Sequence, residues 1–150
     1  EAIADINAFI PADGSPEPLL PARLLDTRDG DTNLTIDNEF EGGGTIPGGG
    51  IVELLVADRG DVQADDETVV LNVGAVRPPA QGFLTVYPCG EDRPLASIVN
   101  YRGGDVVSNS VTAKVGIGGK VCIYVSSETH LIADVVGTVR PVIPAFPAED

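Results

Sequence analysis

The sequence predicts an all-β fold, a two-sheet antiparallel sandwich of about eight to ten strands of the jelly-roll or immunoglobulin-like type. The 150 residues include 18 Gly and 12 Pro but neither Trp nor Met, a composition that suits short strands joined by tight turns. Turn signals containing Gly and Pro recur between apolar runs at the spacing expected of a sandwich. No stretch keeps apolar residues at helical spacing long enough to indicate a helix.

The alternating apolar segments define the expected strands. The run at 68–76 is almost continuously apolar, which predicts a central strand. The full set of expected strands covers residues 2–10, 21–28, 35–40, 51–56, 68–76, 83–87, 96–101, 106–116, 120–125 and 130–136. The corresponding domain boundaries are an N-terminal strand at 1–12, a linker at 13–20, the sandwich at 21–140 and a proline-rich tail at 141–150.

The charge excludes several classes of partner. The chain carries 23 Asp and Glu against nine Lys and Arg, a net charge of −14. Such a chain repels phosphate backbones and anionic lipids, so neither nucleic acid nor a membrane surface is an expected partner. No apolar run approaches the roughly 20 residues that a membrane-spanning helix needs.

The two cysteines favour a disulfide. Cys89 ends the run 82–90, and Cys122 lies inside the alternating run 120–125. A zinc site would need more ligands than these two and the single His130 supply. A Cys89–Cys122 bridge joining two strands implies an oxidising compartment, and hence an extracellular or cell-surface location.

An acidic turn is the one candidate metal site, and calcium is the one candidate cofactor. Asp29 and Asp31 have the odd-position spacing of the first ligands of a calcium loop, but Leu34 stands where the loop needs Gly. Phe40 also stands where the bidentate acid belongs. The turn therefore fails as an EF-hand, and the alternatives are a looser calcium site and a solvated acidic turn.

The other charged residues are interpreted as structural and not as catalytic. Arg23, Asp26 and Arg28 form a charge-dense segment that predicts a partly buried ion pair holding a strand in register. His130, the only histidine, is four residues from Asp134 on one strand, about 13 Å away. Acid, base and nucleophile candidates form no coherent set, so the protein is not expected to be an enzyme. Arg59-Gly60-Asp61 is read as a turn, not as an adhesion motif.

Two short segments near the two ends of the chain are similar in sequence. Residues 2–6, Ala-Ile-Ala-Asp-Ile, align with residues 131–135, Leu-Ile-Ala-Asp-Val. The alternative to a true repeat is a coincidence between two short apolar strands. A chain with a spare terminal strand can lend that strand to the open sheet edge of a neighbour. The residues assigned to this assembly strand are Ile3, Asp5, Ile6 and Phe9.

Five segments together resemble a known domain: 21–28 (Pro-Ala-Arg-Leu-Leu-Asp-Thr-Arg), 69–73, 82–90 (Gly-Phe-Leu-Thr-Val-Tyr-Pro-Cys-Gly), 120–124 and 130–135 (His-Leu-Ile-Ala-Asp-Val). The chain is similar over roughly residues 18–137 to a β-rich extracellular repeat domain of large secreted and surface proteins of Gram-positive bacteria. The resemblance implies secretion and a surface or adhesive role, and it supplies no catalytic residues. It also implies that residues 2–10 followed by 21–28 form a repeat junction.

Two functions follow from these features. The first is a non-catalytic structural or adhesive module that assembles end to end with copies of itself, in a fibre or a tandem array, by terminal strand addition. The alternative is a carbohydrate- or cell-surface-binding module that accompanies a secreted enzyme. Its candidate aromatic platforms are Tyr87, Tyr101 and Tyr124, although packing around the cysteines explains Tyr87 and Tyr124 equally well.

Overall fold

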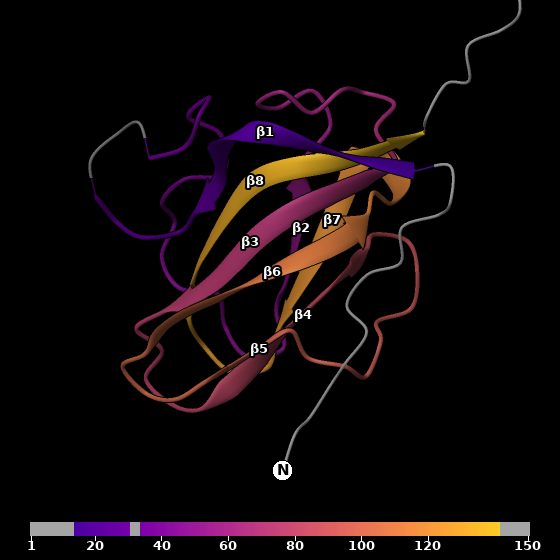
Figure 1. Cartoon of the computed structure of the whole chain (residues 1–150). Coiled ribbons are helices and arrows are strands. Elements are labelled where there is room, and N and C mark those ends of the chain that lie inside the picture. Colours follow the sequence, from indigo (N-terminus) through magenta and orange to yellow (C-terminus); the bar gives the residue numbers. More distant parts are fainter. Residues whose placement is uncertain (1–13, 31–33, 142–150) are drawn as a thin grey trace, which may run out of the picture.

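The computed structural model describes residues 14–30 and 34–141 and contains eight strands in two antiparallel four-stranded sheets (Figure 1). The predicted all-β sandwich is confirmed. The described residues contain no α-helix, and a single 3₁₀ turn, η1, covers Ile117–Gly119. The strands are β1 (Gly14–Asp26), β2 (Ile51–Leu55), β3 (Thr68–Val76), β4 (Gly82–Pro88), β5 (Val99–Tyr101), β6 (Val106–Lys114), β7 (Lys120–Val125) and β8 (His130–Pro141).

The strand order decides between the two expected sandwich types. One sheet has the order β1-β8-β3-β6 and the other has the order β2-β7-β4-β5. All connections except β4–β5 therefore cross from one sheet to the other, which is the arrangement of an eight-stranded jelly roll. β3 lies between β8 and β6, as its continuous apolar sequence predicts.

The core fills the space between the sheets. Alternate residues of each strand point inward, and the fully buried leucines, isoleucine and valines come from both sheets. Leu71 and Val73 of β3 face the layer that contains Leu84 of β4 and Ile123 of β7, and all four are fully buried. Packing of this kind fixes the register of both sheets, because a shift of one residue would turn each apolar set outward.

Two of the expected segment assignments are wrong. The segment 13–20, expected as a linker, belongs from Gly14 onward to β1, which pairs with β8 from Gly14 opposite Pro141. Its prolines are compatible with a strand because β1 lies at the edge of its sheet, where one row of amides needs no partner. The segment 35–40, expected as a strand, forms turns, because Asn38 and Phe40 adopt positive φ angles of 62° and 55°.

One end of the sandwich holds the start of β1 and the end of β8, and the other holds four of the connections between strands. β1 begins and β8 finishes side by side at one end, on the right of Figure 1. The opposite end, which we call the loop end, is built from the four connections β1–β2, β3–β4, β5–β6 and β7–β8. No helix of the described residues has the length and apolar character needed to cross a membrane.

Candidate functional site

Two clefts on the described surface lie at the loop end. Each has a volume of about 610 Å³. The first, the Phe83 cleft, is lined by Gln81, Gly82, Phe83, Asn100, Tyr101, Arg102, Asp105 and Ser126. The second, the His130 cleft, is lined by Arg28, Asp29, Leu34, Thr45, Val76, Arg77 and His130. The β3–β4 connection separates them, with Arg77 in one cleft and Gln81 in the other.

The Phe83 cleft combines an aromatic ring with planar polar side chains. Phe83 of β4 and Asn100 of β5 are direct cross-strand partners, so both side chains lie on the outer face of their sheet. The Phe83 ring lies 6.0 Å from the Tyr124 ring, centroid to centroid, at a tilted angle of 49°. Gln81, Arg102 and Asp105 line the same cleft, and the Asp105 carboxylate accepts from the Arg102 amide at 2.8 Å. A ring edged by such groups offers one apolar surface and several hydrogen-bonding positions to a ligand.

Hydrogen bonds between the loops hold this cleft open. The Tyr101 hydroxyl donates to the carbonyl of Ser127 at 2.5 Å, and the Ser127 hydroxyl donates to the carbonyl of Gln81 at 2.6 Å. The Phe83 amide donates to the Ser126 hydroxyl oxygen at 2.7 Å. Gly82 permits this arrangement, because a Cβ at that position would collide with the Ser127 hydroxyl and the Tyr101 ring. Serines that a hydrolase would need as nucleophiles are here bonded to the backbone.

The His130 cleft gathers basic side chains at neighbouring strand ends. Thr27, which follows β1, donates its amide to the carbonyl of Leu131 at 3.0 Å. On the other side of β8, Val76 is the register partner of His130. Arg28 and Arg77 therefore follow two positions that flank the start of β8, and all three basic side chains line one cleft.

His130 has a structural partner, and Asp134, four residues along the strand, is paired with another residue. The Thr27 hydroxyl oxygen lies 3.0 Å from His130 Nδ1 and accepts the Leu131 amide at 3.0 Å. Asp134 instead accepts from Arg23 Nε at 2.8 Å. The described residues therefore contain no His–Asp pair of the kind that orients a general base.

Arg23, Asp26 and Arg28 form the ion-pair network that anchors the end of β1. Asp26 is fully buried and accepts from Arg28 Nη2 at 2.6 Å and from Arg23 Nη1 at 3.2 Å. Burial raises the pKa of the Asp26 carboxyl, but the hydrogen bonds and charge of Arg28 outweigh burial, so the net pKa is below its ordinary value. The network thereby also positions Arg28 at the rim of the His130 cleft.

A buried arginine holds the β1–β2 connection against the β2–β3 connection. Arg59 is 4% exposed and donates to both carboxylate oxygens of Asp37 at 2.8 Å. Its guanidinium also lies 4.9 Å from the centre of the Phe40 ring. The hydrogen bonds from Arg59 lower the pKa of Asp37 to about 2. An arginine buried in this way is not available to an adhesion receptor, which agrees with the reading of Arg59-Gly60-Asp61 as a turn.

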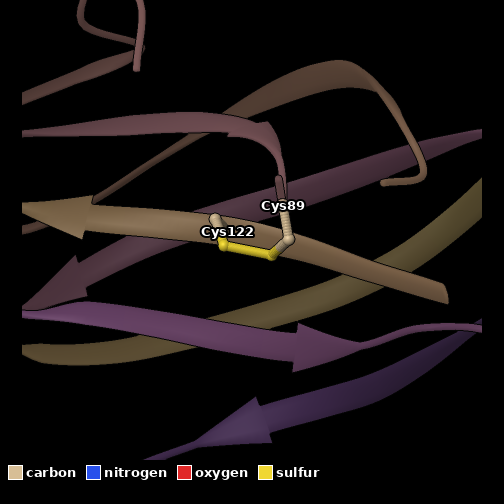
Figure 2. The surroundings of a disulfide bond; sticks show 2 residues. All are labelled: Cys89 and Cys122. Carbon is tan, nitrogen blue, oxygen red and sulfur yellow. A yellow bond between two sulfur atoms is a disulfide. The ribbon is translucent and has the colours of Figure 1, made fainter. Parts of the chain in front are cut away.

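The predicted disulfide is confirmed. Cys89, just after β4, is bonded to Cys122 of β7 (Figure 2). Tyr87 packs against both cysteines with Tyr124 beside it, on the outer face of the sheet, and Tyr87 is only 7% exposed. Tyr124 is half-buried and the guanidinium of Arg93 lies 3.6 Å from its ring centre. Neither tyrosine is therefore a free platform, and Tyr101 is also buried. Phe83, which is half-buried, lines the first cleft together with Tyr101.

The remaining predicted site residues are only partly accounted for. Asp29 lines the His130 cleft, while Asp31 and the assembly residues Ile3, Asp5, Ile6 and Phe9 lie outside the described residues. In the described part, the one group of three side chains spaced to hold a metal ion is Glu53, Cys89 and Cys122. Both cysteines are joined in the disulfide, so that group offers a metal no thiolate.

The fold and the clefts define a disulfide-bonded jelly-roll domain with two clefts of about 610 Å³ at its loop end. No protein-family model and no curated protein matches the chain in sequence. Among solved structures, the chain is similar to the CBM22-1 xylan-binding domain of Xyn10C from Paenibacillus barcinonensis, at 14% identity. The alignment covers 87% of this chain and 98% of that chain, with a TM-score of 0.32. The resemblance to bacterial extracellular repeat domains therefore remains a prediction.

Proposed function

We propose that this protein is a non-catalytic, extracellular glycan-binding module whose primary site is the Phe83 cleft. The observation that carries the proposal is the placement of this cleft. It lies at the loop end, while Gly14 and Pro141 lie together at the opposite end. A ligand at the loop end is thus bound at the end of the sandwich opposite to the start of β1 and the end of β8. Binding sites are commonly carried on loops held by a rigid scaffold of this kind.

The chemistry of the lining favours a carbohydrate. Sugars present ring C–H faces, which pack on aromatic rings, and hydroxyl groups, which pair with amides, carboxylates and guanidinium groups. The Phe83 ring supplies the first kind of surface, and Asn100, Gln81 and Arg102 supply the second.

Substitution in the cleft tests this function. Phe83→Ala and Asn100→Ala are each expected to weaken binding of a glycan identified on a polysaccharide array by about five- to tenfold. Asn100 is exposed, so its replacement should leave the thermal melting temperature unchanged. The matched control is Leu95→Ala, a fully exposed residue in the β4–β5 connection at the other end of the sandwich, which should bind as the parent protein does. Failure to bind any plant, fungal or bacterial glycan, or binding unchanged by both cleft variants, would overturn the proposal.

Self-assembly by strand addition is a second candidate function, favoured by one edge of the structure. β6 pairs with β3 along all nine of its residues and is the last strand of its sheet. It contains no proline, and its one charged residue is Lys114 at its end. Edge strands without such protection accept additional strands, whereas the opposite edge, β1, contains three prolines. Residues 2–10 of another copy, with Ile3, Ile6 and Phe9, are the proposed added strand.

Deletion of residues 1–12 tests this candidate. The complete chain is expected to form a ladder of oligomers in size-exclusion chromatography, and the shortened chain is expected to run as a folded monomer. Ser110→Pro is the complementary variant. The Ser110 amide donates to the side chain of Asn109 and so faces the open edge of β6, where proline removes a donor without breaking the ladder to β3. Oligomers that survive both changes, or a complete chain that is strictly monomeric, would refute strand addition.

A further inference from the structure

We infer that the His130 cleft is a second glycan subsite, specific for the carboxylate of a uronic acid residue. The inference rests on the proposed glycan-binding function and adds to it the class of sugar. It begins from the uneven distribution of basic groups: a chain with nine Lys and Arg and one His places two of its arginines and its histidine around one cleft.

The sheet order produces this concentration. β1, β8 and β3 are consecutive neighbours in one sheet (Figure 1), and adjacent strands are about 4.8 Å apart. Arg28 follows the end of β1 by two residues, His130 opens β8, and Arg77 immediately follows β3. The three residues thus lie in a row across one end of the sheet. In the sequence, Arg28 and Arg77 are 49 residues apart, and Arg77 and His130 are 53 residues apart.

The Thr27 hydroxyl contacts one ring nitrogen of His130. The Thr27 hydroxyl oxygen accepts the Leu131 amide and lies 3.0 Å from His130 Nδ1. A hydroxyl has one proton and two acceptor lone pairs, so this contact accommodates either tautomer of the neutral ring. In the tautomer that carries the proton on Nε2, His130, whose side chain lines the cleft, offers Nε2–H as a donor to a ligand.

Arg77 supplies the charge. Four arginines of the chain, Arg23, Arg28, Arg59 and Arg140, are paired with aspartates, and Arg93 lies over the Tyr124 ring. Within the described residues, Arg77 has no carboxylate partner, although it lines the His130 cleft in a protein with a net charge of −14. Its backbone is fixed at a φ of 49°, with its amide donating to the carbonyl of Asp105 at 2.7 Å. The Arg77 side chain is exposed, and a guanidinium pairs bidentately with a carboxylate.

The rest of the cleft selects a sugar carboxylate over other anions. Asp29 lines the same cleft and repels a doubly charged phosphate more strongly than a singly charged carboxylate. The Asp29 carboxylate is also an acceptor for hydroxyl groups, and the Thr45 hydroxyl, which donates to Glu128 at 2.6 Å, keeps lone pairs for them. A hexuronate carries both kinds of group, a carboxylate for Arg77 and His130 and hydroxyls for Asp29 and Thr45.

The test compares an acidic oligosaccharide with its neutral counterpart. Binding of hexuronate oligosaccharides, and of the same oligosaccharides with their carboxyl groups reduced to alcohols, is measured by titration calorimetry at 0.1 M salt. The acidic form is expected to bind about tenfold more tightly, and Arg77→Gln is expected to remove that preference while leaving binding of the neutral form unchanged. Lys114→Gln, which removes the same charge from the opposite end of the sandwich, is the control and should keep the preference.

The outcomes separate the subsite from the general function. Equal affinity for the acidic and neutral forms, or an acidic preference that Arg77→Gln does not reduce, overturns the uronate subsite while glycan binding at the Phe83 cleft stands. Competition by inorganic phosphate as strong as that by the hexuronate overturns the specificity, because the cleft would then bind anions in general. Binding of neither form, together with a negative polysaccharide array, overturns both proposals.

Discussion

Replacement of Cys89 and Cys122 by alanine is expected to lower the free energy of unfolding by roughly 3–4 kcal/mol, which is the chain-entropy contribution of a bridge across about 33 residues. The bridge spans a separation of 33 residues and encloses β5, β6 and η1. β5 is the shortest of the eight described strands, with three residues, so the enclosed part depends on the bridge to keep its ends together. Urea denaturation followed by tyrosine fluorescence measures the change.

Two controls identify the covalent bond as the cause. Reduction of the parent protein should reproduce the loss of stability, whereas the same reductant should not alter the double alanine variant. Alanine avoids burying two hydroxyl groups in the cluster around Tyr87, where both cysteines are buried. An unchanged urea midpoint after reduction would show that β4 and β7, which are already hydrogen-bonded neighbours, need no covalent link.

The strands of this fold were predictable where each segment carries its own pattern. The expected strands at 68–76 and 120–125 coincide with β3 and β7, because alternating or continuous apolar residues are sufficient to define them. The segment 35–40 looked similar but forms turns around Asn38 and Phe40. Phe40 there contacts the buried Arg59, an interaction with a partner 19 residues away that the local sequence does not reveal.

The clefts were less predictable because they depend on strand order. Arg28, Arg77 and His130 each have an ordinary place in the sequence, and none lies in a recognisable motif. They become neighbours only when β8 is inserted between β1 and β3. A sequence signal for the Phe83 cleft did exist, since Phe83 stands at the start of a strand beside Gly82, on the face opposite Leu84. Tyr87, Tyr101 and Tyr124 were instead considered as aromatic platforms for a ligand, and in the structure they pack against neighbouring side chains.

The jelly-roll order also bears on how the module is displayed. With β1 beginning next to the end of β8, a neighbouring segment on either side of the domain would attach at the same end, and both clefts would face away from it. This geometry supports a pendant binding module more directly than a rod in which domains join at opposite ends. Strand addition along β6 is compatible with either display, because that edge runs along the side of the sandwich.

Asp26→Asn is expected to lower the free energy of unfolding by about 3 kcal/mol at pH 7, because it removes one partner of a buried ion pair. Asp26 is fully buried between Arg23 and Arg28, and the new amide would place a donor against two guanidinium groups. Asp134→Asn is the matched control. Asp134 bonds the same Arg23 but is 25% exposed, so its replacement should cost less than about 1 kcal/mol. Equal losses in the two variants would contradict a special role for burial.

The same substitution should change the response of the protein to acid. Because Arg28 holds the folded-state pKa of Asp26 below its ordinary value of 3.8, the ionised carboxylate contributes stability above about pH 4. That stability is lost as the pH falls through the folded-state pKa. Asp26→Asn should therefore show a shallower loss of stability on acidification below pH 4 than the parent, measured by urea denaturation at stepped pH. Asp37, whose pKa is about 2, remains in the variant and keeps part of the acid sensitivity. A variant as acid-sensitive as the parent would show that Asp26 is not held ionised by Arg28, and the anchor proposed for the Arg28 side of the His130 cleft would fail with it.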